Sequence, residues 1–75
     1  MVCNKCHNHA EYKVTINAMV QDTVVVKHIK NLYFCSECID ARAKPRLKEL
    51  KHNKSFTLGY RCGRVIFDYI YTKEN

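Results

Sequence analysis

The residues with the clearest chemistry are the four cysteines of two C-x-x-C motifs, Cys3/Cys6 and Cys35/Cys38. Thiolates are soft ligands, and each motif can present two sulfurs to the same ion. Two such motifs would complete a closed tetrahedral shell that leaves no open position for a substrate or a water molecule. The spacing therefore predicts one structural Zn²⁺ ion and argues against zinc-mediated hydrolysis.

Paired cysteines have three other uses, and each fits this chain less well. Two disulfides would require secretion, yet no basic stretch followed by an apolar one stands near Met1. A rubredoxin-like iron site is allowed by the ligands alone. Rubredoxins, however, are acidic and usually carry Pro and Gly around the second motif, where this chain has Ser36, Glu37 and Ile39. A thioredoxin-type redox pair needs a βαβ context that the pattern does not offer.

The remaining reactive residues give no positive support for catalysis. His7 and His9 flank the first motif, where either could replace a cysteine or support one, but four thiolates already suffice and a surface loop is the simpler interpretation. Cys62 stands alone beside Gly63 and is better explained as a turn residue than as a nucleophile. The sequence shows no Ser/His/Asp set, no paired carboxylates and no Gly-rich phosphate loop. We therefore expect a protein that is not an enzyme.

Length and charge limit the class of protein. A chain of 75 residues is one domain whose hydrophobic core alone supplies only about 3–5 kcal/mol, so a metal staple is expected. No apolar run approaches the roughly 20 residues of a membrane span. Reduced thiols favour the cytoplasm. The formal charge of +6 falls by about two when four thiolates hold a divalent ion, and this basic balance suits nucleic acid or an acidic protein surface.

Alternating apolar and polar residues predict an N-terminal β-hairpin. The first strand should cover residues 11–18, in which Tyr12, Val14 and Ile16 alternate with polar side chains. A break at residues 21–22 precedes a β-branched second strand over residues 23–29. Asn31 then marks a turn, and a short extended piece, residues 32–34, leads to the second cysteine motif.

The second half predicts a helix followed by another hairpin. Apolar side chains at Ile39, Ala43, Leu47 and Leu50 form the stripe of an amphipathic helix. Pro45 interrupts it, so we expect either a kink or a short turn with a second helix that begins near this proline. Residues 56–71 alternate again and predict a hairpin that turns at residues 62–64, with a helix over residues 65–71 as the weaker alternative.

The order of cysteine motif, hairpin, cysteine motif and helix resembles a treble-clef zinc finger. Residues 33–40, Tyr-Phe-Cys-Ser-Glu-Cys-Ile-Asp, look like the second knuckle of the N-terminal zinc-binding domain of the ClpX unfoldase. That resemblance implies a protein-docking module that dimerises and receives adaptors and substrates. The chain departs from the family by a longer spacer, by Pro45 and by the lack of the ATPase, so it cannot itself be an unfoldase.

We therefore expect a small α+β zinc-stapled domain, treble-clef-like, with a C-terminal β-hairpin. Residues 1–54 would form the four-cysteine zinc-binding module, and residues 55–75 an aromatic-rich extension that packs on it within a single domain. Both parts offer surfaces. The expected partner-binding residues are the basic side chains of the helix and of the second hairpin, together with three tail aromatics: Arg42, Arg46, Lys48, Lys51, Arg61, Arg64, Phe67, Tyr69 and Tyr71.

Two functions remain in competition. The leading hypothesis is a non-catalytic interaction module that acts as an adaptor or modulator of a larger protein machine, such as a Clp-type AAA+ protease system. Surplus aromatic side chains in the tail would then supply a partner interface or a homodimer interface. The alternative is a DNA- or RNA-binding zinc finger that uses the basic helix face, although Asp40 and Glu49 interrupt that face.

Overall fold

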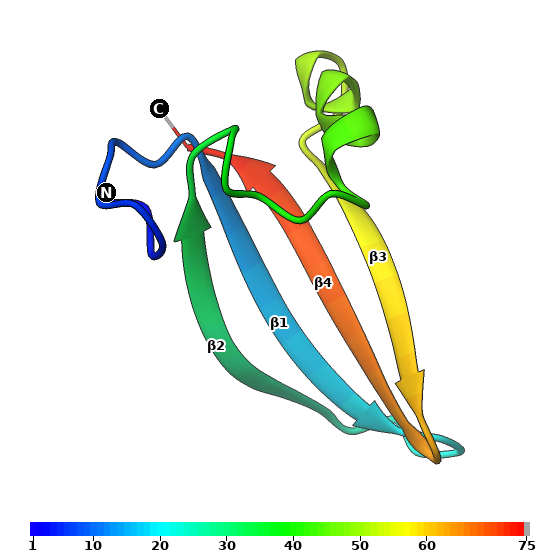
Figure 1. The fold of residues 1–75 in the computed structure, drawn as a ribbon. Helices are drawn as coiled ribbons and strands as arrows, with labels where there is room; N and C mark the ends of the chain where they lie inside the picture. Colours follow the sequence, from blue (N-terminus) through cyan, green and yellow to red (C-terminus); the bar gives the residue numbers. More distant parts are fainter. Residues whose placement is uncertain (75) are drawn as a thin grey trace.

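A single antiparallel sheet of four strands dominates the molecule (Figure 1). A computed structural model describes residues 1–74, and residue 75 lies outside the described residues. The spatial order of the strands is β2-β1-β4-β3, so the two hairpins lie side by side with β2 and β3 at the edges. One short 3₁₀ helix, η1, completes the fold. The elements are β1 (Tyr12–Val20), β2 (Val26–Phe34), η1 (Lys44–Lys51), β3 (Ser55–Cys62) and β4 (Val65–Lys73).

The first hairpin confirms the predicted alternation in β1, where Tyr12, Val14 and Ile16 are all buried. Its second strand differs from the prediction: β2 starts at Val26 rather than at residue 23. The predicted turn at Asn31 is wrong, because Asn31 pairs with Thr15 and the strand continues to Phe34. A register shift opposite residues 16–17 absorbs one extra residue, Ile29, in β2.

The second hairpin is confirmed, and the helical alternative for residues 65–71 is wrong. Strands β3 and β4 pair from Ser55↔Thr72 to Cys62↔Val65. The connecting turn contains Gly63 at a φ of +61°, a left-handed conformation that glycine adopts without a steric cost. β4 also pairs along its whole length with β1, so the expected extension contributes two strands to the same sheet as the first hairpin.

Of the two alternatives predicted at Pro45, the structure has the second, a short turn followed by a helix that begins next to the proline, although this helix is 3₁₀ rather than α. Turns fill residues 36–43, and η1 begins only at Lys44, next to Pro45. Proline removes a helical N–H and its ring clashes with the carbonyl four residues earlier, so the helix cannot run through this position. The side chain of Asp40 also accepts a bond from the Arg42 amide (3.0 Å), which stabilises the local turn before η1.

The hydrophobic core lies between one face of the sheet and the segment from the second cysteine motif to η1. Ile39 and Ala43 are buried, and Leu47 and Leu50 are half-buried against the same cluster, so the predicted apolar stripe does face the core. The rings of Phe56 and Tyr71 stack beneath them with centroids 4.8 Å apart.

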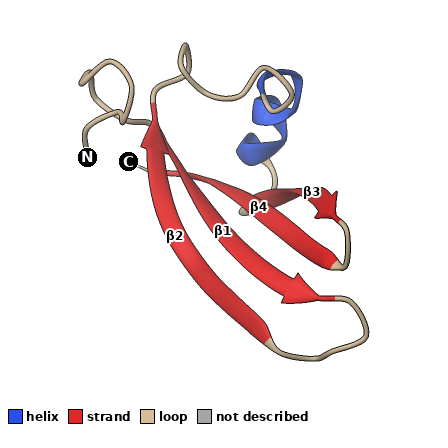
Figure 2. Cartoon of the chain, turned by 60° about the horizontal axis from the view of Figure 1, so that its bottom comes forward, coloured by secondary structure: helices blue, strands red, loops and turns tan. Residues whose placement is uncertain are grey.

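We call this side of the sheet the core face. Figure 2 shows that the helix and the loops gather over one end of the sheet, while the strands extend well beyond them. Within residues 1–74, no helix has the length and apolar character needed to cross a membrane.

Candidate metal centre

The structure brings the four predicted ligands together. The Sγ atoms of Cys3, Cys6, Cys35 and Cys38 all lie within 4.8 Å of one another, and the pair Cys6–Cys35 is separated by 3.5 Å. A tetrahedral zinc with Zn–S bonds near 2.3 Å places its sulfurs about 3.8 Å apart. The observed separations bracket that value, so four thiolates could close around a single ion with only small side-chain movements. The donor set and its spacing therefore fit one metal ion.

The first motif is a tight loop closed by its own backbone. The amide of Cys3 donates to the carbonyl of Asn8 (2.7 Å), and the amide of His7 donates to the carbonyl of Cys3 (3.1 Å). His7 has a φ of +65°, and this left-handed conformation turns the chain back so that Val2 bridges to His9. Both histidines are exposed, and neither joins the cluster of metal-ligating side chains found in residues 1–74.

The second motif is fixed to the hydrophobic core. It follows β2 directly, and the amides of Cys38 and Ile39 both donate to the carbonyl of Cys35 at 3.2 Å. This turn directs the side chain of Ile39 into the core, where it is only 3% exposed. Cys35 is buried and Cys38 is half-buried, so the position of this sulfur pair is set by packing as well as by backbone hydrogen bonds.

Asn4 joins the two motifs and was not singled out by the sequence. Its amide donates to the carbonyl of Tyr33 (2.7 Å), and its side-chain oxygen accepts a bond from the amide of Tyr33 (2.9 Å). These two bonds attach the first motif to the outer edge of β2, just before Cys35. The only signal in the sequence was an Asn inside a C-x-x-C turn, a residue type that often bonds to nearby backbone groups.

Within the close-packed cluster of thiols, the pKa values of Cys3 and Cys38 are shifted in opposite directions. Burial pushes the pKa of Cys3 upward, but backbone hydrogen bonds at Cys35, Cys6 and Lys5 outweigh it and lower the pKa to about 6. Hydrogen bonds to Cys35 and Cys6 raise the pKa of Cys38 to about 12. Four sulfurs in contact cannot all ionise without a counter-charge, and a divalent cation provides one when it replaces the protons.

Cys62 stays apart from this cluster. It is exposed at the end of β3, pairs across the sheet with Val65, and lies next to the turn at Gly63. All five cysteines in the described part of the chain are free, so the disulfide interpretation of the two motifs finds no support in the structure.

The expected partner-binding residues do not form one surface. Arg61 and Arg64 lie at the hairpin turns, at the opposite end of the sheet from η1 (Figure 1). Arg61 bonds to the side chain of Gln21, and Arg64 lies 3.9 Å from the carboxylate of Asp22. Both arginines therefore help to hold the two hairpin turns together.

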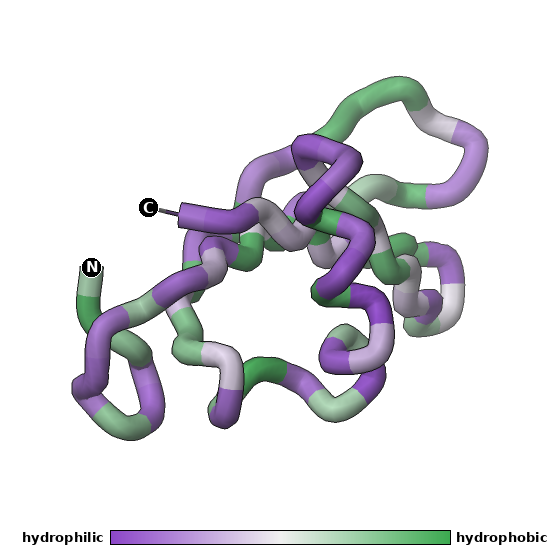
Figure 3. Tube along the Cα trace, turned by 90° about the horizontal axis from the view of Figure 1, so that it is seen from above, coloured by the Kyte–Doolittle hydropathy of each residue, from purple (hydrophilic) through white to green (hydrophobic). Residues whose placement is uncertain are grey.

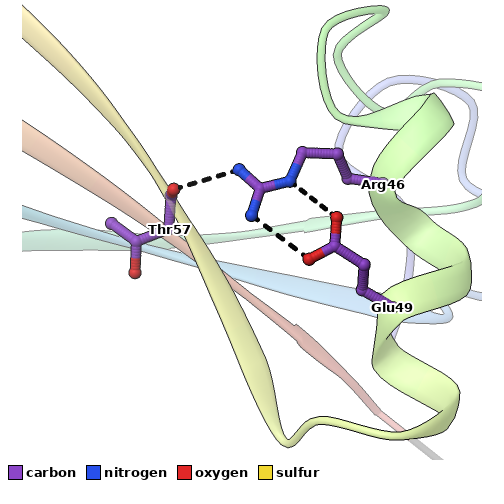
Figure 4. A network of polar contacts seen from close by, with 3 residues as sticks. All are labelled: Arg46, Glu49 and Thr57. Atoms are coloured by element: carbon purple, nitrogen blue, oxygen red, sulfur yellow. Dashed lines mark hydrogen bonds and ion pairs between the residues drawn. The ribbon is translucent and has the colours of Figure 1, made fainter.

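The basic residues of the helical segment differ in how much they are used internally. Arg46 is engaged: its guanidinium contacts Glu49 at 2.8 Å and the backbone oxygen of Thr57 at 3.4 Å (Figure 4), and it lies over the ring of Phe56. Lys48 and Lys51 belong to η1 and make no ion pair within residues 1–74. Arg46 thus ties η1 to the edge strand β3, whereas the two lysines do not serve such a contact.

The three tail aromatics also separate. Tyr71 is only 1% exposed and sits in the core, because its position in β4 faces Val14 on one side and Phe56 on the other. Its side chain therefore cannot act as a surface anchor in the folded chain. Phe67 and Tyr69 are half-buried on the same face, farther from η1.

The sequence reasoning missed an exposed apolar surface at the β1–β2 loop. Five aliphatic residues in and next to the β1–β2 loop are exposed, and we call them the valine tip: Val20, Val24, Val25, Val26 and Ile29. Figure 3 shows an apolar stretch on a wide loop that projects away from the rest of the chain. The run of valines predicted a strand, but residues 23–25 lie outside the sheet, so their side chains face solvent.

Comparison with known proteins adds no relative: no family model, no curated protein and no solved structure matches this chain.

Proposed function

We propose that this protein is a non-catalytic, zinc-stapled module that binds another protein through the valine tip. The exposed tip is the observation that carries the proposal: Val24 is 97% exposed and Val25 71% exposed. Contiguous apolar side chains on a small protein are costly to keep in water and commonly mark an interface.

The loop that carries the valine tip is anchored at its base, and this supports a binding role. The amide of Gln21 donates to the carbonyl of Arg64 (2.7 Å), and the side chains of Arg61 and Gln21 bond across the same gap. The second hairpin thus braces the loop of the first. A loop that is already ordered loses less conformational entropy when it binds, so more of its apolar contact contributes to affinity.

The role of the metal in this proposal is structural. A shell of four cysteine sulfurs is closed, and a single Zn²⁺ would attach the first motif to a sheet that otherwise holds it by few contacts. Such a site leaves no position at which to activate water. The chain is accordingly proposed to have no catalytic activity and to work in the reducing cytoplasm, where thiols remain available to the metal.

The class of partner is suggested by residues 33–40, which resemble the second knuckle of the ClpX zinc-binding domain. We propose an adaptor or modulator of a larger protein machine, such as a Clp-type AAA+ protease system. The treble-clef-like arrangement belongs to this proposal as well: two cysteine motifs separated by a hairpin are in place, with a 3₁₀ helix where that fold has an α-helix.

Affinity capture tests the proposal. The tagged, zinc-loaded protein would be incubated with nuclease-treated bacterial extract, in parallel with the double variant Val24→Ser/Val25→Ser and with Lys54→Gln, an exposed position, as a surface control. One dominant protein retained by the wild type and by the control but lost with the valine variant would support the proposal. Equal retention of that protein by all three baits would exclude the valine tip as the binding surface. Self-association lost only in the valine variant would identify a second copy as the partner.

Nucleic-acid binding is the second candidate, because most of the positive charge is free. Of 13 Lys and Arg residues, only Arg46 and Arg64 take part in ion pairs within the described part of the chain. Unpaired cations release counterions from phosphates, so affinity for an oligonucleotide should fall steeply as salt rises. Absence of binding even at low salt would rule this candidate out.

A further inference from the structure

The core face of the sheet continues past the elements that cover it and carries aromatic side chains there. Opposite residues of antiparallel strands project to the same face. Val14 of the core lies opposite Tyr71, so the next pairs along this face are Ile16 with Tyr69 and Ala18 with Phe67. On β3 the matching positions are Leu58 and Tyr60. We call this uncovered region the open face, and its residues are Leu58, Tyr60, Phe67 and Tyr69.

Most of the open face lies beyond the covering segment, which reaches only its edge, where Asp40 and Arg42 contact Tyr60. Ile39 and Ala43 lie over the core, and of the four strands η1 makes substantial contact only with β3. Figure 2 shows the sheet extending beyond the helix and the loops. Tyr60, Phe67 and Tyr69 accordingly remain half-buried, in contrast to the fully covered Tyr71.

The rings of the open face are rigidly placed. Tyr60 and Tyr69 meet edge to face with centroids 4.7 Å apart, and the guanidinium of Arg42 lies 4.7 Å from the centroid of Tyr60. The hydroxyl of Tyr60 donates to the carboxylate of Asp40 at 3.0 Å. Because Arg42 lies over its ring, Tyr60 braces this surface, and Phe67 and Tyr69 are the rings left to stack planar groups.

Positive charge borders the same surface. Lys30 pairs across the sheet with Ile16 and Lys27 with Ala18, so both lysines stand on the core face along β2. Both are exposed, and neither has an ion-pair partner among residues 1–74. Arg42 stands on the side of β3. The nearest carboxylate, Asp40, is already engaged by Tyr60 and by the amide of Arg42.

A cavity of about 320 Å³ adjoins the open face beneath the second cysteine motif. Its walls include Tyr69, which it shares with the open face, and the apolar side chains of Val14 and Leu32. Lys5 of the first motif also lines it. The surface therefore offers both exposed rings and an apolar recess, each with a cation beside it.

We propose that the open face binds single-stranded nucleic acid. Bases would stack on Phe67 and Tyr69 while phosphates contact Lys27 and Lys30. A duplex uses its own stacking and offers mainly phosphates, so partly exposed rings beside cations favour unpaired bases. This inference rests on the second candidate function and specifies both its surface and its ligand.

Fluorescence anisotropy with labelled oligo(dT) and oligo(rU), and with a duplex of equal length, tests the inference on the zinc-loaded chain. The single strands should bind more tightly than the duplex. Phe67→Leu and Tyr69→Leu keep apolar bulk but remove a ring, and each should weaken single-strand binding by about fivefold to a hundredfold. Zinc content and circular dichroism would verify that both variants fold.

The double variant Lys27→Gln/Lys30→Gln tests the proposed phosphate contacts, with Lys13→Gln as the matched control. Lys13 alternates with the buried residues Tyr12 and Val14, so its side chain points to the opposite face of the sheet. The double variant should flatten the slope of log K against log salt by about 1.4, and the control should change binding less than twofold.

Binding that is unaffected by the ring and lysine variants, or equally tight for the duplex, would overturn the open face as a single-strand site while leaving nucleic-acid binding intact. Absence of binding to all three oligonucleotides at low salt would overturn the candidate function itself.

Discussion

Replacing Tyr71 by alanine should unfold a large part of the protein population. Tyr71 is 1% exposed, stacks on Phe56, and lies opposite Val14 in the central pair of strands. Removing a buried aromatic ring costs about 3–5 kcal/mol, which includes the lost transfer energy and the cavity that remains. A domain of this size draws roughly 3–5 kcal/mol from its core, so the variant should be marginal even with metal bound.

Urea unfolding followed by circular dichroism, with zinc in excess, measures this loss. Tyr71→Phe is the matched control because it keeps the stacked ring and should lose less than about 1.5 kcal/mol. Tyr69→Ala removes the same side chain from a half-buried neighbouring position and should cost clearly less than Tyr71→Ala. A free energy of unfolding for Tyr71→Ala within about 1 kcal/mol of the wild-type value would be a loss well below that expected for a buried ring. That result would refute the placement of this ring in the core.

Three further outcomes are expected. Cys35→Ser should abolish stoichiometric zinc binding, whereas Cys62→Ser should retain it in mass spectrometry under native conditions; equal loss in both would contradict the ligand set. Gly63→Ala should lower the free energy of unfolding by about 1–2 kcal/mol, because alanine is strained at a φ of +61°. No atom lies within 4 Å of the added Cβ, so the whole loss would come from the backbone conformation. An unchanged denaturation midpoint would argue against the turn. Val24→Ser should leave stability within about 0.5 kcal/mol, since its side chain is 97% exposed, and a large destabilisation would show that the valine tip packs in the free protein.

The sequence predicted the parts of the fold that depend on local chemistry. The alternation of Tyr12, Val14 and Ile16 identified β1, and the glycine at position 63 located the turn between β3 and β4. The spacing of the cysteines identified the cluster. In each case the signal is a side-chain pattern or a backbone requirement within a few residues, and the tertiary structure is consistent with that local preference.

Features that depend on contacts distant in the chain were not predictable. Nothing near Tyr71 shows that Val14 and Phe56 flank it, so a surface anchor and a core residue read alike in the sequence. Val24 and Val25 have the composition of a strand, but pairing with β1 begins only at Val26. The effect of Pro45 was stated as two alternatives, and the structure has the turn followed by a helix that begins at Lys44.

The most direct test of the central claim, that one metal ion on four cysteines holds this fold together, is chelation followed by circular dichroism, with the metal stoichiometry measured on the same sample. One zinc ion per chain is expected, together with loss of the folded spectrum and its cooperative melting when the metal is removed, and recovery when zinc is restored. A purified protein that contains no metal, or that keeps its spectrum and melting transition after complete removal of the zinc, would contradict the claim.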